Sequence, residues 1–275
     1  ISLGTLASRI LGFVRDIILA KFLGTGFQAD ALFVAFRIPN LFRDFVGEGA
    51  TNSAVVPVFS EHLVKEERTT FWRFVSGVLL LAAAVLIVLS ILGVLLAPVI
   101  VRLIAPGFIE SPQKLSLTVS LTRIMFPYLF FIGLTAYSMA ILYTFRKFTA
   151  PAFSPCLLNI AIIASAVYSF WYMKNPVYGI AVGILVGGFL QMAVQIPPLY
   201  TIGFRFQTPI LWHHPGIRQI WTLLIPRMVG SGVYQLTIFV DTFCASLASI
   251  VGAGGISAIY YSNRIIQLPM GVFSI

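Results

Sequence analysis

Charged side chains occur in segments of this chain that are otherwise apolar enough to cross a membrane. The first apolar segment contains Arg9, Arg15 and Asp16. The second contains five more charged residues, namely Asp30, Arg37, Arg43, Asp44 and Glu48. An ionised side chain at the centre of a bilayer costs about 2.5–3.5 kcal/mol on insertion scales, so such a cluster persists only if it faces protein groups or a water-filled cavity. The charges therefore predict a hydrated cavity inside a membrane protein, and this cavity is the predicted functional site.

Arginine and carboxylate groups in such a cavity permit two kinds of chemistry. Guanidinium groups bind phosphate oxygens through paired hydrogen bonds, which are stronger in a partly desolvated site than in water. Carboxylates could instead relay protons or bind a coupling cation. The acidic and basic residues of the first two segments nearly balance, so the composition alone leaves both alternatives open.

The composition indicates an integral membrane protein made of α-helices. Hydrophobic residues make up 59% of the 275 residues and charged residues only 10%, which leaves too little polar surface for a soluble domain. This length accommodates about eight spans of roughly 20 apolar residues. We predict spans at 2–22, 28–60, 72–105, 115–145, 151–173, 177–203, 217–249 and 255–275.

Several function classes do not fit the sequence. The net charge of +9 does not indicate nucleic-acid binding, because the basic residues form no patch interleaved with aromatic residues. Basic loops on the cytoplasmic side explain the charge better and place the N-terminus in the cytoplasm. There is no nucleotide-binding P-loop and no Ser/His/Asp set that can be placed together, so we expect no enzyme and no cofactor. We also expect no metal site, since no further ligands are near His213 and His214.

A weak internal repeat relates the start of the chain to its end. Asp16 and Asp241 each lie in an apolar segment that ends at a glycine turn, and each turn leads into a segment with an arginine, Arg37 or Arg264. The offset encloses six predicted spans, an even number, so the two copies run in the same direction, as in transporters with two lobes. We predict a six-helix N-terminal lobe at 1–203, with a connection and the start of the second lobe at 204–275.

Helical periodicity collects the charges of the second span on one face. Asp30, Arg37 and Asp44 are spaced by seven residues, and Asn40 adjoins them. Pro39 interrupts the backbone hydrogen bonds within this polar stripe, so a bend or hinge is expected there.

Three other spans have similar polar faces. Arg9 and Asp16 share a face of the first span, Arg227 and Asp241 share one in the seventh, and Arg264 lies on the eighth. Single pairs could be salt bridges that hold helices together. Polar stripes on at least four helices instead favour one shared hydrated interior.

Two parts of the chain resemble a known family. Residues 8–16 read SRILGFVRD, residues 29–43 read ADALFVAFRIPNLFR and residues 48–50 read EGA, while residues 260–264 read YYSNR and residues 268–271 read LPMG. These stretches resemble the signatures of the MurJ (MviN) family. That family comprises the lipid II flippases of the multidrug/oligosaccharidyl-lipid/polysaccharide (MOP) exporter superfamily.

The resemblance implies a function. A central cavity would take the pyrophosphate and sugar-peptide head of lipid II and carry it across the bacterial cytoplasmic (inner) membrane by alternating access, without a covalent step. A coupling ion or the membrane potential would drive the cycle, and the partners would be lipid II and membrane lipids, with contacts to other cell-wall synthesis proteins left open. Two alternatives are a cation-coupled exporter of drugs or of another lipid-linked oligosaccharide, and an inactive scaffold for cell-wall enzymes.

The resemblance also implies roles for individual residues. Arg9 and Arg15 match first-helix arginines of the family, while Arg43 and Arg264 match arginines of its second and eighth helices. Asp44 departs from the pattern, in which a second basic residue often follows the arginine at position 43. The predicted substrate-binding set is Arg9, Arg15, Arg43, Arg264 and Asn40. The predicted gating or coupling set is Asp16, Asp30, Arg37, Pro39, Glu48, Arg227 and Asp241.

Overall fold

A computed structural model describes residues 2–46, 48–209, 211, 214–247, 251–252 and 254–273, and these residues are almost entirely helical. No strand occurs within these ranges. The helices are α1 (Ser2–Leu23), α2 (Phe27–Val46), α3 (Glu48–Lys65), α4 (Arg68–Ile104), the 3₁₀-helix η1 (Pro106–Glu110), α5 (Pro112–Met125), α6 (Tyr128–Thr144), α7 (Thr149–Tyr172), α8 (Pro176–Ala193), α9 (Ile196–Thr201), α10 (Pro215–Ser246) and α12 (Gly255–Phe273).

The helices follow the predicted spans closely. The predicted spans 28–60, 115–145 and 177–203 each correspond to two consecutive helices, α2 with α3, α5 with α6, and α8 with α9. Five stretches of the described chain are long and apolar enough to cross a membrane: Arg68–Ile104, Pro112–Thr144, Thr149–Tyr172, Pro176–Thr201 and Pro215–Ser246. The prediction of an all-α polytopic membrane protein is thus confirmed.

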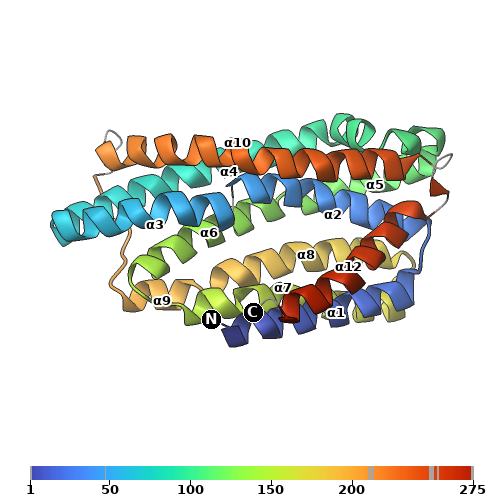
Figure 1. The fold of residues 1–275 in the computed structure, drawn as a ribbon, viewed down its shortest axis with the longest axis horizontal. Helices are drawn as coiled ribbons and strands as arrows, with labels where there is room; N and C mark the ends of the chain where they lie inside the picture. The colour runs from blue at the N-terminus through green and yellow to red at the C-terminus, as the bar shows by residue number, and fades with distance from the viewer. Residues whose placement is uncertain are drawn as a thin grey trace.

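Figure 1 shows how the helices are grouped along the long axis of the molecule. Helices α1, α7 and α8 pack on one another on one side, and α2 to α6 lie together with α10 on the other. Helix α12 starts beside the first turn of α2 and crosses toward α1. Helices from the two ends of the sequence therefore meet, and α12 contacts both α1 and α2.

Apolar side chains both fill the interior and cover the outer surface. One buried cluster joins α2, α5, α7 and α8, and a second joins α3, α4, α6 and the start of α10. Helix α4 also has a long row of exposed apolar residues, which includes Ile91, Leu95 and Val99. Such a row would be unfavourable in water, so it indicates a surface that faces lipid.

Pro39 lies inside α2, and the helix continues past it to Val46. The proline therefore does not end the helix, although it removes one backbone donor. The side-chain amide of Asn40 donates a hydrogen bond of 3.1 Å to the carbonyl of Phe36 in the preceding turn. This bond does not replace the one lost at Pro39, which in a regular helix would go to the carbonyl of Ala35.

Candidate functional site

A cavity of about 330 Å³ lies between α1, α2, α10 and α12. Aromatic side chains, including Phe33, Phe36 and Tyr260, form part of its wall. It brings together six residues that the sequence analysis selected from four different helices, namely Arg15, Arg37, Asn40, Arg43, Asp241 and Arg264. Four of these six are arginines, so the cavity is suited to an anionic group.

Arg15 and Asp16 form a buried ion pair at the edge of this cavity. The Nε and Nη2 groups of Arg15 donate hydrogen bonds of 2.9 and 2.8 Å to Oδ1 of Asp16, and the two residues are only 7% and 5% exposed. Nη1 of Arg15 donates to Asn159 of α7 at 3.0 Å, and Nη2 also donates to the hydroxyl of Tyr260 at 3.2 Å. Arg15 thus ties α1 to both α7 and α12, while its guanidinium group lines the cavity.

Asp16 is shared between two arginines from opposite ends of the chain. Its Oδ2 lies 3.3 Å from Nε of Arg264, and its Oδ1 accepts the bonds from Arg15. The Arg264 side chain is 40% exposed, and its guanidinium carbon lies 5.2 Å from the centre of the Tyr260 ring. Arg264 is consequently oriented by one carboxylate and one aromatic face, and part of it remains accessible from the cavity.

Arg37 connects α2 to α10 at the same cavity. Its Nη1 donates a hydrogen bond to the hydroxyl of Thr242. Asp241, the neighbouring residue on α10, is exposed and also lines the cavity. Arg43, six residues further along α2, also lines the cavity and is half-buried. Arg37 and Arg43 therefore both face the cavity from α2.

Asp30 lies outside the cavity, where α2 and α12 both begin. It is 1% exposed, and its Oδ2 accepts a hydrogen bond of 2.7 Å from Nζ of Lys114 in α5. Its Oδ1 accepts bonds from the backbone N–H and the hydroxyl of Ser257, at 2.9 and 2.8 Å. Because the first backbone N–H groups of a helix have no partner within the helix, Asp30 caps α12 in the manner of a local N-cap residue.

Three further predicted residues, Arg9, Pro39 and Arg227, do not line this cavity. Arg9 is exposed on α1, and Arg227 is exposed on α10, and neither contributes to the lining. Pro39 is buried within α2 behind the lining residues. Glu48 begins α3, but its side chain lies outside the residues that the structure describes.

Some residues of the site were missed by the sequence analysis. Asn159 and Thr242 supply partners for the arginines, and Lys114 and Ser257 supply partners for Asp30. The signal for Asn159 was available, since it is a single amide in an otherwise apolar span. Lys114 lies one residue before the predicted span 115–145, and hydroxyl residues are too common in membrane helices to be selected by type alone.

The expectation that no further ligands lie near His214 is wrong. His62 in the last turn of α3 and Glu66 directly after this helix both contact His214 at the start of α10. The segments are far apart in the sequence, so only the fold reveals the cluster. His213 lies outside the described residues.

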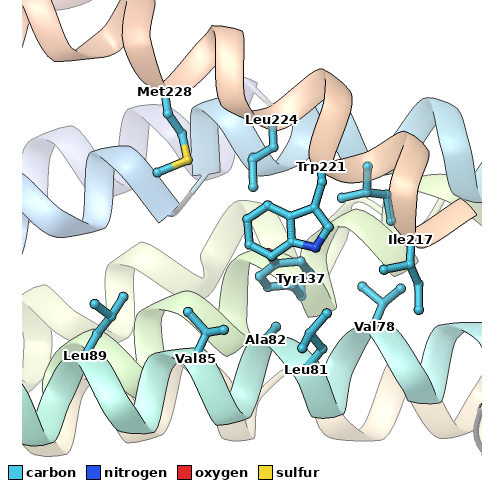
Figure 2. A pocket seen from close by; sticks show the side chains of 11 residues that line it. Val78, Leu81, Ala82, Val85, Leu89, Tyr137, Ile217, Trp221, Leu224 and Met228 are labelled. Atoms are coloured by element: carbon cyan, nitrogen blue, oxygen red, sulfur yellow. The ribbon is translucent and has the colours of Figure 1, made fainter. Parts of the chain in front are cut away.

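A second cavity, of about 230 Å³, separates α4 and α6 from the first half of α10. Figure 2 shows the indole of Trp221 pointing into it above Tyr137, with Val78, Val85 and other apolar side chains around them. None of its lining residues is charged, so it offers no charge to bind an anion.

Comparison with known proteins shows the family. Residues 19–275 match the family model described as "Lipid II flippase MurJ". The chain belongs to the MurJ family. It is 35% identical over 278 residues to the lipid II flippase MurJ of Burkholderia cenocepacia, a match that covers 98% of this chain and 53% of that protein. It is also 36% identical to a probable lipid II flippase MurJ of Buchnera aphidicola, over 100% of this chain and 53% of the relative.

The MurJ fold is seen directly in a solved structure. A lipid II flippase MurJ in an inward closed conformation matches 100% of this chain with a TM-score of 0.83 and 31% identity, and the match covers 56% of that MurJ chain. A multidrug resistance transporter of the MATE family in an inward-facing conformation matches with a TM-score of 0.65 and 15% identity, which shows the MOP fold alone. The chain spans about half the length of the curated MurJ relatives it matches.

Proposed function

We propose that this protein moves lipid II across the bacterial cytoplasmic membrane by alternating access. The observation that carries the proposal is the cavity that brings together arginines from α1, α2 and α12 in a member of the MurJ family. Lipid II carries a pyrophosphate, and guanidinium groups recognise phosphate oxygens through charge-assisted hydrogen bonds. No covalent step is required, because transport needs only binding and release on opposite sides.

The charges of the cavity support binding of an anionic headgroup. Among the described side chains, four arginines and one acidic residue, Asp241, line it, and Asp16 lies directly behind Arg15 and Arg264. Arg15 is held by Asp16 and Asn159, so its orientation is fixed before substrate arrives. Fixed donors lose less conformational entropy on binding than flexible ones do, which favours affinity.

The contacts between the ends of the chain suggest what changes during transport. Arg264 pairs with Asp16, and Arg37 donates to Thr242, so α12 and α10 are both held against the first two helices. A pyrophosphate that binds Arg264 would compete with Asp16 for its donors. A ligand shifts a conformational equilibrium only by its difference in affinity between the two states, and this competition would provide such a difference.

The remaining assignments complete the proposal. We place the N-terminus in the cytoplasm, and we assign residues 1–203 to an N-terminal lobe and 204–275 to the connection and first helices of a second lobe. The membrane potential would act on a positively charged empty cavity with about 2.3 kcal/mol per charge per 100 mV, so it could drive the return step. Lipid II and membrane lipids would be the partners.

Genetic complementation tests the proposal. Bacteria depleted of their own flippase should survive when they express the wild-type protein and should lyse when they express Arg264→Ala at equal membrane abundance. Arg102→Ala serves as the matched control, because Arg102 is an exposed arginine of α4 that does not line the cavity. Rescue by Arg264→Ala, or failure of the wild-type protein to bind lipid II in native mass spectrometry, would contradict the proposal.

A further inference from the structure

Three side chains with no role in the proposed transport meet where α3 ends and α10 begins, at the left end of the molecule in Figure 1. Nδ1 of His62 lies 2.7 Å from Oε1 of Glu66, one helical turn later. Nε2 of His214 lies 2.9 Å from the same oxygen. The possible ligand atoms of the three residues all lie within 4.8 Å of one another.

The cluster is shielded from solvent on several sides. The His214 ring stacks on Phe74 with ring centres 4.2 Å apart, and the His62 ring lies 5.1 Å from the same phenyl ring. Among the described residues, Oε2 of Glu66 is buried and has no hydrogen-bond partner. Buried carboxylate oxygens normally have a partner, so this one calls for an explanation.

We propose that His62, Glu66 and His214 bind a divalent transition-metal ion of the Zn²⁺ type. Two imidazole nitrogens and one carboxylate oxygen are a ligand set that zinc uses when a fourth position is left to water. Tetrahedral ligands at normal zinc distances lie about 3.4 Å apart, so Oε1 of Glu66 would have to move by about half an ångström from each imidazole nitrogen. The two imidazole nitrogens, up to 4.8 Å apart, would have to come closer together. The unpartnered Oε2 of Glu66 would then gain a cation or a metal-bound water as its partner.

The hydrogen bonds of His214 show which ring nitrogen carries the proton before an ion binds. The backbone N–H of Gly216 donates to Nδ1 of His214 at 3.2 Å, so without an ion Nε2 carries the proton and donates it to Glu66. To bind an ion at Nε2, the neutral ring must carry its proton on Nδ1 instead, so the 3.2 Å hydrogen bond from Gly216 would be lost. Only a neutral imidazole can bind a metal ion, because the binding nitrogen must be unprotonated.

A metal ion at this position would join two segments that lie far apart in the sequence, with α4 to α9 between them. His62 lies in the last turn of α3, Glu66 is the residue directly after that helix, and His214 is the N-cap residue of α10. Because the ion binds only when both segments are in place, it would stabilise the folded protein and hold α10 against α3.

Zinc titration of the purified protein in lipid nanodiscs tests the site. After EDTA treatment, the wild-type protein should bind a single Zn²⁺ in competition with a chromophoric chelator, and Zn²⁺ but not Mg²⁺ should raise its unfolding temperature. His62→Gln and His214→Gln should each weaken zinc binding by at least about tenfold, the size of change that even outer-shell substitutions produce. Glu61→Gln is the matched control, because Glu61 links the same helices through Gln219 without joining the cluster.

Three results would overturn the site. They are a wild-type protein that binds no zinc, histidine variants that retain wild-type affinity, and an equal loss in Glu61→Gln. If a histidine variant fails to fold, Co²⁺ bound to the wild-type protein gives the answer, since its absorption bands report tetrahedral coordination by nitrogen and oxygen, and their absence counts against the site. None of these measurements depends on lipid II transport.

Discussion

Asp30 accepts two hydrogen bonds from Ser257, one from its backbone N–H and one from its hydroxyl, across 227 positions of the sequence. The same carboxylate is paired with Lys114 at 2.7 Å. One side chain of α2 thus holds the first turn of α12 and the first turn of α5. It was predicted as a gating residue, and its contacts give that prediction a structural basis without testing it.

Asp30→Asn should destabilise the protein by about 3 kcal/mol, because it leaves the partly buried ammonium group of Lys114 without its counter-charge. Thermal unfolding in nanodiscs measures the effect. Addition of Lys114→Met should recover part of the loss, since the double variant no longer buries an unpaired charge. An unfolding temperature of Asp30→Asn within about one degree of the wild type would show that the pair is not buried in the membrane-embedded protein.

Arg264→Lys should lower lipid II binding by about tenfold or more, although the charge is retained. Arginine presents a planar pair of donors to a phosphate, and lysine presents a compact ammonium group without that geometry. Native mass spectrometry with lipid II measures the affinity. Equal affinity in the two forms would mean that the site reads charge alone.

Asp16→Asn should tighten binding of the pyrophosphate group and slow transport. The substitution removes a negative charge beside Arg15 and Arg264, so an anion no longer competes with it for the two guanidinium groups. Lipid II affinity and translocation in proteoliposomes should therefore change in opposite directions. A weaker affinity would instead show that Asp16 acts mainly by orienting the arginines.

Asn159→Leu should destabilise the protein by about 1–3 kcal/mol, because Arg15 loses a buried acceptor and the carbonyl of Ser8 loses a donor. Thermal unfolding checks this value. Ile160→Leu is a suitable control, since Ile160 is exposed on the same helix. A change in Asn159→Leu no larger than in the control would indicate that Arg15 does not depend on this contact.

The sequence predicted the helices well because their apolar runs are long and end at loops. It also selected Arg37, Arg43 and Arg264, all of which line the cavity. Charged residues in a membrane helix must avoid contact with lipid, so their type and position predict which helix faces line a polar interior. The rotation of each helix about its own axis is harder to predict from the sequence. For this reason Arg9 and Arg227 were selected, although neither lines the cavity.

Specific partners could not be deduced from periodicity. Adjacent residues on a helix point about 100° apart, so helical periodicity gives no reason to pair Arg15 with Asp16. The long Arg15 side chain nevertheless reaches back to its neighbour. His62 and His214 come together only because α3 and α10 pack on each other. Contacts of this kind depend on the tertiary arrangement, which a single sequence does not specify.

Two side-chain contacts, at different points along its length, hold helix α12 against α1 and α2. Ser257 is bound by Asp30, and Arg264 is bound by Asp16, about 10 Å further along the helix axis. If substrate binding separates Arg264 from Asp16 while Asp30 stays bonded to Ser257, the helix can rotate about its first turn. A local exchange of one ion pair would then become a displacement that grows toward the far end of α12.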